Sequence, residues 1–288
     1  MDYLIFILGL TILVFSGKYL VQGGVSIAKY FKIPTMVIGV TVIAFGTSAP
    51  ELLVSMQAAL SGSPEIAFGN VIGSNISNIG LVLAFTAILI PIPVHKNALR
   101  LDWPVMMIAS ILLYIFTFNN ILGFYEGLIL FTLLAAYLYY SVTKSNKDND
   151  TGQDEKTIKP QYKLYISIIL VVVSSLGLAL GADLLVNSAV NIAVEWGLSK
   201  RVISITIVAF GTSVPELTAS IIAALKKQTD ISIGNIIGSN IFNIMAVLGI
   251  TSMIQEIHID HVAFAFDIIW MMFVSILLYL FIYPFKTV

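Results

Sequence analysis

Long apolar segments follow one another along most of this chain, separated by short polar stretches. A membrane-spanning helix needs roughly 20 apolar residues, and nine segments reach or approach that length: about 3–28, 35–59, 66–90, 103–118, 124–142, 164–194, 202–225, 231–254 and 262–283. The short alternating strands of a membrane β-barrel are not seen. The pattern therefore predicts an all-α polytopic membrane protein.

Composition agrees with this class. Of the 288 residues, 58% are hydrophobic and 11% are charged, against about 25% charged in soluble domains. The net charge of −1 gives no reason to expect a nucleic-acid partner. The absence of cysteine excludes disulfides and thiolate metal sites.

Two motifs occur twice. IAFGTSAPE at 43–51 returns as VAFGTSVPE at 208–216, and GNVIGSNISNI at 69–79 returns as GNIIGSNIFNI at 234–244. Seven of nine and nine of eleven positions are identical, always at an offset of 165 residues. Such agreement indicates an internal duplication.

Five predicted spans separate equivalent positions, and because five is odd the second repeat must be inverted in the membrane. Inverted repeats are typical of secondary transporters. We divide the chain into three parts. The first repeat is 1–143 and contains the ion-binding motif 39–80, the polar linker is 144–162, and the second repeat is 163–288 and contains the motif 204–245. A counterpart of the span 124–142 would fall beyond residue 288, so we expect nine spans with the last helix missing.

Basic residues predict the orientation, because they favour the cytoplasmic side. With the N-terminus outside, twelve Lys and Arg residues face the cytoplasm and only Lys200 and Arg201 face outward, with Lys18 inside a span. We therefore expect a multi-pass protein of the inner cell membrane with a cytoplasmic linker at 144–162.

Glu51 and Glu216 lie near the middle of two predicted spans. A carboxylate in hydrocarbon costs several kcal/mol and marks a functional site by default. Pro50 lacks an N–H and, together with Gly46, is expected to break the first of these spans and free nearby backbone carbonyls. A purely structural glutamate is the alternative, but the repetition of the same residue among oxygen-bearing neighbours argues against it.

Four pairs of oxygen-bearing side chains are spaced four residues apart, so each pair shares one helical face. These pairs are Thr47 with Glu51, Ser74 with Asn78, Thr212 with Glu216, and Ser239 with Asn243. Oxygen ligands suit hard cations such as Na⁺, Ca²⁺ and Mg²⁺, and two carboxylates balance one divalent ion. Because Mg²⁺ dehydrates reluctantly, an all-protein site favours Ca²⁺.

The paired AFGTSxPE and GNxxGSNxxNI motifs resemble the two α-repeats of the Na⁺/Ca²⁺ exchanger family, within the cation/Ca²⁺ antiporter superfamily, here of the prokaryotic type. The resemblance covers nearly the whole chain. It implies two inverted groups of five helices, in which two long helices slide past an ion site. The ligands that it implies are the following: Glu51, Glu216, Thr47, Ser48, Ser74, Thr212, Ser213, Ser239, Asn78, Asn243 and the carbonyls of Ala44 and Ala209.

The resulting functional hypothesis is a secondary antiporter that exchanges Na⁺ for Ca²⁺ by alternating access. The alternatives are an H⁺- or K⁺-coupled exchanger, a passive cation channel and a transport-dead scaffold. Some members of the family that co-transport K⁺ have Asp at the position of Asn243, so the neutral Asn78 and Asn243 favour exchange without K⁺. We expect no enzymatic activity and no cofactor, and take a monomer in the lipid bilayer as the working assumption.

Two structural hypotheses also follow from the sequence. Lys18 and Asp183 occupy equivalent places in two spans and are predicted to form a salt bridge, with snorkelling to separate interfaces as the alternative. The repeated glycines of the second motif, Gly69, Gly73, Gly234 and Gly238, are expected to allow close helix packing.

Overall fold

The computed structural model describes residues 1–94, 97–149, 160–198, 211–259 and 261–285. Within these ranges the chain is almost wholly helical, and its only sheet is the short pair β1 (Ile121–Leu122) and β2 (Ile257–His258). The elements of the first half are α1 (Asp2–Phe31), α2 (Thr35–Ile38), η1 (Gly39–Ile43), α3 (Ala44–Leu60), α4 (Pro64–Ser77), η2 (Asn78–Leu83), α5 (Ala84–Leu89), η3 (Ala98–Asp102), α6 (Trp103–Phe116), η4 (Thr117–Asn119) and α7 (Phe124–Asn149). Those of the second half are α8 (Leu164–Glu195), α11 (Val214–Leu225), α12 (Thr229–Phe242), η6 (Asn243–Leu248), α13 (Gly249–Ile254) and α14 (His261–Phe285).

Eight helical segments in the described ranges are long and apolar enough to cross a membrane. They are Asp2–Phe31, Thr35–Leu60, Pro64–Leu89, Ala98–Asn119, Phe124–Lys144, Leu164–Glu195, Thr229–Ile254 and Ala265–Tyr283. Each matches a predicted span, which confirms the all-α polytopic fold. The remaining predicted span, 202–225, is described only from residue 211 onward, and this part contains the shorter apolar helix α11.

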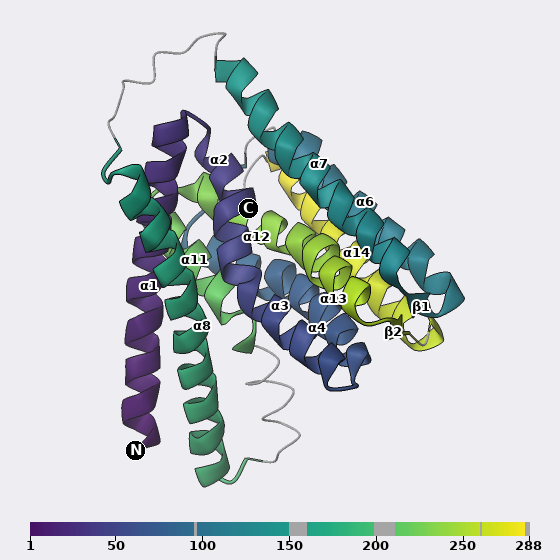
Figure 1. Cartoon of the computed structure of the whole chain (residues 1–288). Coiled ribbons are helices and arrows are strands. Elements are labelled where there is room, and N and C mark those ends of the chain that lie inside the picture. The colour runs from purple at the N-terminus through teal and green to yellow at the C-terminus, as the bar shows by residue number, and fades with distance from the viewer. Residues whose placement is uncertain (95–96, 150–159, 199–210, 260, 286–288) are drawn as a thin grey trace.

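The helices form three groups in space (Figure 1). The long helices α1 and α8 lie together along one side, and α6, α7 and α14 lie on the opposite side. Between them, α3, α4, α12 and α13 occupy the centre. In the span from α12 through α13, 94% of the residues in an 18-residue apolar window are buried in the protein, a larger share than in the other seven described spans. Other helices surround this span. The candidate motifs therefore lie on the most enclosed helices.

The two repeats are inverted, as α1 and its equivalent α8 illustrate. A Cβ atom built on Gly9 would meet Gly181, whereas one built on Gly23 would meet Ser167. The contact partner thus moves towards the start of α8 as the position moves towards the end of α1. The two helices run antiparallel, which confirms the inversion predicted from the odd number of spans.

The second motif folds identically in both repeats. Helix α4 and helix α12 end at equivalent residues, and each is followed by a π-helical turn that begins at an asparagine, Asn78 or Asn243. Turns of this kind are rare and often mark functional positions. The duplication therefore extends from sequence to the irregular details of the backbone.

The glycine prediction holds for the second repeat. A Cβ on Gly238 would lie 2.6 Å from Cα of Val40, and one on Gly234 would lie 3.1 Å from Cα of Gly39. These glycines let α12 press directly onto η1. A Cβ on Gly69 or Gly73 meets no atom within 4 Å among the described contacts. In the first repeat, the residues expected to face Gly69 and Gly73 are the equivalents of Gly39 and Val40, at positions 204 and 205. These positions lie outside the described residues, so close packing at Gly69 and Gly73 stays a prediction.

The described backbone differs between the two repeats at one equivalent place, because Thr47 and Ser48 lie within α3 whereas Thr212 and Ser213 do not lie in a helix. The positions equivalent to η1, 204–208, lie outside the described residues. In the first repeat, the irregular turn is the π-helical η1, and α3 then continues through Pro50, so it lies earlier than we expected from Gly46 and Pro50. The hydroxyl of Thr41 donates to the carbonyl of Val37 at 2.6 Å and satisfies one backbone acceptor of this turn. In the second repeat, Thr212 and Ser213 form a turn and Pro215 lies in the first turn of α11.

The predicted salt bridge between Lys18 and Asp183 is wrong. Asp183 accepts a hydrogen bond from Asn187 at 2.9 Å, and the ammonium of Lys18 lies 5.7 Å from the ring of Tyr19. Because α1 and α8 run antiparallel, with Gly9 against Gly181 and Gly23 against Ser167, Lys18 and Asp183 lie at different levels along the pair. At 1.5 Å per residue they are roughly 10–16 Å apart along the helix axis.

Candidate ion-binding site

Glu51 on α3 and Glu216 on α11 are both fully buried, with 0% of either residue exposed. Ser48, one turn before Glu51, donates a hydrogen bond across the repeat boundary to Oε1 of Glu216 at 3.1 Å. The structure thus brings together two acidic residues that are 165 positions apart in the sequence.

A set of hydroxyl groups connects α3 with α12. Oγ1 of Thr47 lies 3.2 Å from Oγ of Ser239 and donates to Oδ1 of Asn235 at 3.0 Å. It also lies 3.2 Å from the carbonyl oxygen of Ala44. The hydroxyls of this group are thereby fixed in place, and each keeps lone pairs for a further ligand.

The equivalent hydroxyls of the other repeat also meet. Oγ of Ser74 on α4 lies 3.4 Å from Oγ1 of Thr212, which precedes α11. Together with the Thr47 contacts, this distance places all four motif segments around one region. Ala209, whose carbonyl the family resemblance implies as a ligand, lies outside the described residues.

Asn78 and Asn243 are fully buried and each donates its amide N–H to an asparagine of the opposite repeat. Nδ2 of Asn78 donates to Oδ1 of Asn240 at 3.0 Å, and Nδ2 of Asn243 donates to Oδ1 of Asn75 at 3.1 Å. The amide nitrogens are thus engaged, which leaves the amide oxygens of Asn78 and Asn243 for another partner.

Six buried side-chain oxygens at the candidate positions have no hydrogen-bond partner in the described part of the chain. They are Oε1 and Oε2 of Glu51, Oε2 of Glu216, Oδ1 of Asn78, Oδ1 of Asn243 and Oγ of Ser213. A buried oxygen without a donor is costly, and a group of them on neighbouring helices has the chemistry of a hard-cation shell. The remaining buried oxygens of this kind are scattered singly, on Ser26, Ser232 and Thr251.

Several polar residues that contact the candidate ligands were not predicted from the sequence. Asn75 and Asn240 contact the two ligand asparagines, and Asn235 donates both to the backbone carbonyl of Glu216 at 3.3 Å and to Oγ of Ser220 at 3.0 Å. The signal was available, because all of them recur at the offset of 165 residues.

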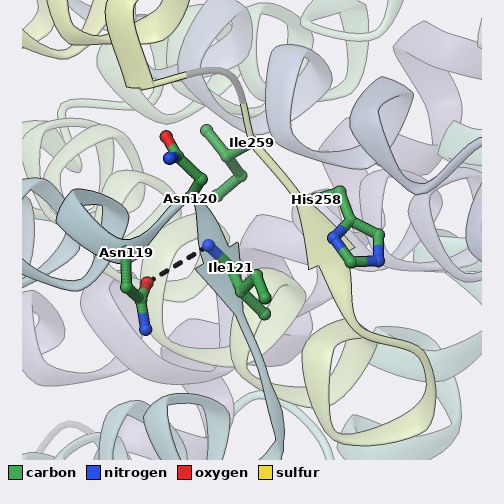
Figure 2. A pocket seen from close by; sticks show the side chains of 5 residues that line it. All are labelled: Asn119, Asn120, Ile121, His258 and Ile259. Carbon is green, nitrogen blue, oxygen red and sulfur yellow. Dashed lines mark hydrogen bonds between the residues drawn. The ribbon is translucent and has the colours of Figure 1, made fainter.

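A separate pocket of about 480 Å³ lies beside the β1–β2 pair (Figure 2). It is lined by Asn119, Asn120, Ile121, His258 and Ile259. Oδ1 of Asn119 accepts a hydrogen bond from the backbone N–H of Ile121 at 3.1 Å. His258 is the only ionisable residue among the lining residues, so the pocket offers no carboxylate to a cation. We therefore place the candidate ion site at the buried glutamates and not at this pocket.

An inverted-repeat membrane fold with buried oxygen atoms available as ligands on its central helices is typical of secondary transporters. The family model described as sodium/calcium exchanger protein matches residues 1–143 and 166–287. The chain is 38% identical over 283 residues to a protein of Alkalimonas amylolytica provisionally named antiporter CaxA, covering 96% of this chain and 88% of the relative. It is 29% identical over 318 residues to sodium/calcium exchanger MaX1 of Methanosarcina acetivorans, covering 98% and 91%.

The structure is also similar to the solved sodium-calcium exchanger NCX_Mj, with a TM-score of 0.82 and 33% identity, over 99% of this chain and 92% of the other. The chain belongs to the sodium/calcium exchanger family. Members of this family are membrane transporters, and the likeness supports a cation/Ca²⁺ antiporter.

Proposed function

We propose that this protein exchanges Na⁺ for Ca²⁺ across the membrane by alternating access. The observation that carries the proposal is the group of six buried oxygens that have no donor among the described residues, which includes three of the four carboxylate oxygens of Glu51 and Glu216. Ca²⁺ takes six to eight oxygen ligands, and two carboxylates neutralise its charge. Na⁺ is also a hard cation that binds oxygen, so one set of ligands serves both ions in turn.

The proposed ligands are the residues that the sequence nominates, with Glu51 and Glu216 at the centre. The amide oxygens of Asn78 and Asn243 add to the carboxylates. Four hydroxyls from the four motif segments join them, namely those of Thr47, Ser74, Thr212 and Ser239. Ser48 supports Glu216 in this structure and, with Ser213 and the carbonyls of Ala44 and Ala209, stays within the proposed set.

The proposed membrane arrangement follows the basic residues. The N-terminus lies outside, the polar stretch 144–162 is cytoplasmic, and the membrane is the inner cell membrane. The two repeats, 1–143 and 163–288, each contribute one glutamate to the site. Relatives named as sodium/calcium exchangers support this choice of ions.

Uptake of radiolabelled Ca²⁺ into proteoliposomes tests the proposal. Vesicles loaded with Na⁺ and diluted into Na⁺-free medium should accumulate Ca²⁺, whereas vesicles with equal Na⁺ on both sides should not. Uptake driven by an H⁺ or K⁺ gradient without Na⁺ would instead identify a differently coupled exchanger. Uptake that follows the Ca²⁺ gradient alone would identify a channel.

A further inference from the structure

Four asparagines from the two repeats form one symmetric network across the interface between α4 and α12. Nδ2 of Asn75 donates to the backbone carbonyl of Asn240 at 3.2 Å, and Nδ2 of Asn240 donates to the backbone carbonyl of Asn75 at 3.3 Å. Both residues are 1% exposed. This pair joins the repeats at equivalent positions, so it lies on the axis that relates them.

The orientation of both amides is fixed by their surroundings. Besides the carbonyl, Nδ2 of Asn75 lies 3.6 Å from Sδ of Met271, and Nδ2 of Asn240 lies 3.6 Å from Sδ of Met106. A backbone carbonyl and a thioether can accept a hydrogen bond but cannot donate one. Only the nitrogen of each amide can therefore face them, and the amide oxygen must point the other way.

The fixed orientation of Asn75 and Asn240 in turn determines the orientation of the amides of Asn78 and Asn243. Oδ1 of Asn240 can only accept, so Asn78 must present its N–H to it, and the same holds for Asn243 against Oδ1 of Asn75. Oδ1 of Asn78 and Oδ1 of Asn243 are consequently turned away from the network. These are two of the six buried oxygens that have no donor in the described part of the chain.

We propose that Asn75 and Asn240 are positioning residues: they fix the amide orientation of Asn78 and Asn243 so that oxygen, never N–H, is presented to the transported cation. The inference rests on the proposed function. Asn75 and Asn240 have both their amide nitrogen and their amide oxygen bonded within the network, whereas the oxygens of Asn78 and Asn243 have no donor among the described residues. The proposal therefore gives the ligand role to Asn78 and Asn243 alone. An N–H turned into the site would repel a cation and remove one ligand, so the network controls cation affinity from outside the ligand shell.

A double-mutant cycle on Ca²⁺ binding separates this role from ordinary packing. Asn240→Leu removes the acceptor that holds Asn78, whose amide can then rotate. We expect the dissociation constant for Ca²⁺ to rise about 10–100-fold, as is usual when a partner of a metal ligand is lost. Asn78→Ala has no amide that can turn, so adding Asn240→Leu to Asn78→Ala should change the constant less than about threefold.

An equal penalty for Asn240→Leu in both backgrounds would overturn the proposal, because a packing defect is indifferent to the chemistry of residue 78. Asn75→Leu with Asn243→Ala repeats the cycle in the other half, and Asn240→Ala replaces the leucine variant if that does not fold. Equilibrium binding of radiolabelled Ca²⁺ to purified protein is the readout. Failure of the unmodified protein to bind Ca²⁺ would overturn the proposed function itself, which the cycle alone does not test.

Discussion

Ser48 donates a hydrogen bond to Oε1 of Glu216 at 3.1 Å, whereas the repeat-equivalent pair, Ser213 and Glu51, makes no such bond within the described residues. The two half-sites are therefore chemically equivalent but conformationally different. Inverted repeats direct equivalent half-sites to opposite sides of the membrane. A site that opens to one side at a time requires this kind of difference.

The hydroxyls show the same asymmetry. Thr47 donates to Oδ1 of Asn235 at 3.0 Å, whereas no bond joins the equivalent Thr212 and Asn70 within the described residues. The two asparagines agree only in donating to equivalent serines, Asn70 to Ser55 at 3.2 Å and Asn235 to Ser220 at 3.0 Å. Asn235 is fully buried and Asn70 is only partly so. The half of the site next to α12 is thus the more tightly bonded one in this conformation.

Removal of either central carboxylate should abolish exchange. In Glu51→Gln or Glu216→Gln, one of only two charges that balance a dehydrated divalent ion is lost, which costs about 3–5 kcal/mol. This corresponds to at least about a 100-fold loss of Ca²⁺ uptake. Glu65→Gln, an exposed glutamate at the start of α4, is the matched control and should transport normally. Near-normal uptake in either buried variant, with the protein folded, would contradict the site assignment.

Exchange should not require K⁺. The neutral Asn78 and Asn243 leave two carboxylates as the acidic groups of the proposed ligand set. Those two charges are balanced by one Ca²⁺, and an accompanying K⁺ would leave an uncompensated positive charge in a buried site. Na⁺-driven Ca²⁺ uptake should therefore be equal in K⁺-free and K⁺-containing media. A strict need for K⁺ on the Ca²⁺ side would refute this prediction.

Gly238→Ala should destabilise the protein, because its Cβ would lie 2.6 Å from the backbone Cα of Val40 and 2.8 Å from Cβ of Ala44. Overpacking of this kind costs about 1–3 kcal/mol. Gly80→Ala, whose Cβ meets nothing within 4 Å, is the control. Thermal unfolding in detergent should show a lower midpoint for Gly238→Ala alone. Equal midpoints for the two variants would mean that α12 does not press on η1 as described.

The stability effects of Lys18→Met and Asp183→Asn should simply add. The two residues form no ion pair, and sites that share no contact are additive within about 0.3–0.5 kcal/mol. Lys226 is the cationic neighbour of Lys18: its Nζ donates to the carbonyl oxygen of Lys18 at 3.1 Å, and burial together with the Lys18 charge lowers the pKa of Lys226. A coupling free energy well above that limit, measured in a double-mutant cycle by thermal unfolding, would show that Lys18 and Asp183 interact after all.

The proposed orientation can be tested with single cysteines, because the native chain has none. Ser61→Cys, in the exposed loop before α4, should react with an impermeant maleimide added outside whole cells. Lys163→Cys, at the end of the polar linker, should react only after the membrane is opened. The reverse labelling pattern would invert the topology.

The span boundaries were predictable because hydrophobic length and polar loops decide them locally. The start of α8 was predicted at residue 164 and lies at Leu164. The duplicated motifs likewise predicted the inverted fold and nominated Glu51 and Glu216, both of which are buried. These features depend on residue type and spacing, which a sequence displays directly.

The errors concern contacts between segments that are distant in sequence. Lys18 and Asp183 are equivalent by offset, but in an antiparallel pair equivalent residues lie far apart except at the one level where they face each other. Only the structure shows which residues are level, with Gly9 and Leu13 against Gly181 and Gly23 against Ser167. The role of Asn75 and Asn240 was missed for a similar reason. A buried amide acquires its function from what its nitrogen and oxygen face, and those partners belong to the opposite repeat.

The central claim is that Na⁺ and Ca²⁺ occupy one shared set of oxygens in turn. Equilibrium binding of radiolabelled Ca²⁺ to the purified protein, titrated with NaCl at constant ionic strength, tests it most directly. Na⁺ should displace all bound Ca²⁺ competitively, so that the displacing Na⁺ concentration rises with Ca²⁺, while choline at equal concentration displaces none. Ca²⁺ binding that persists at saturating Na⁺ would contradict the claim.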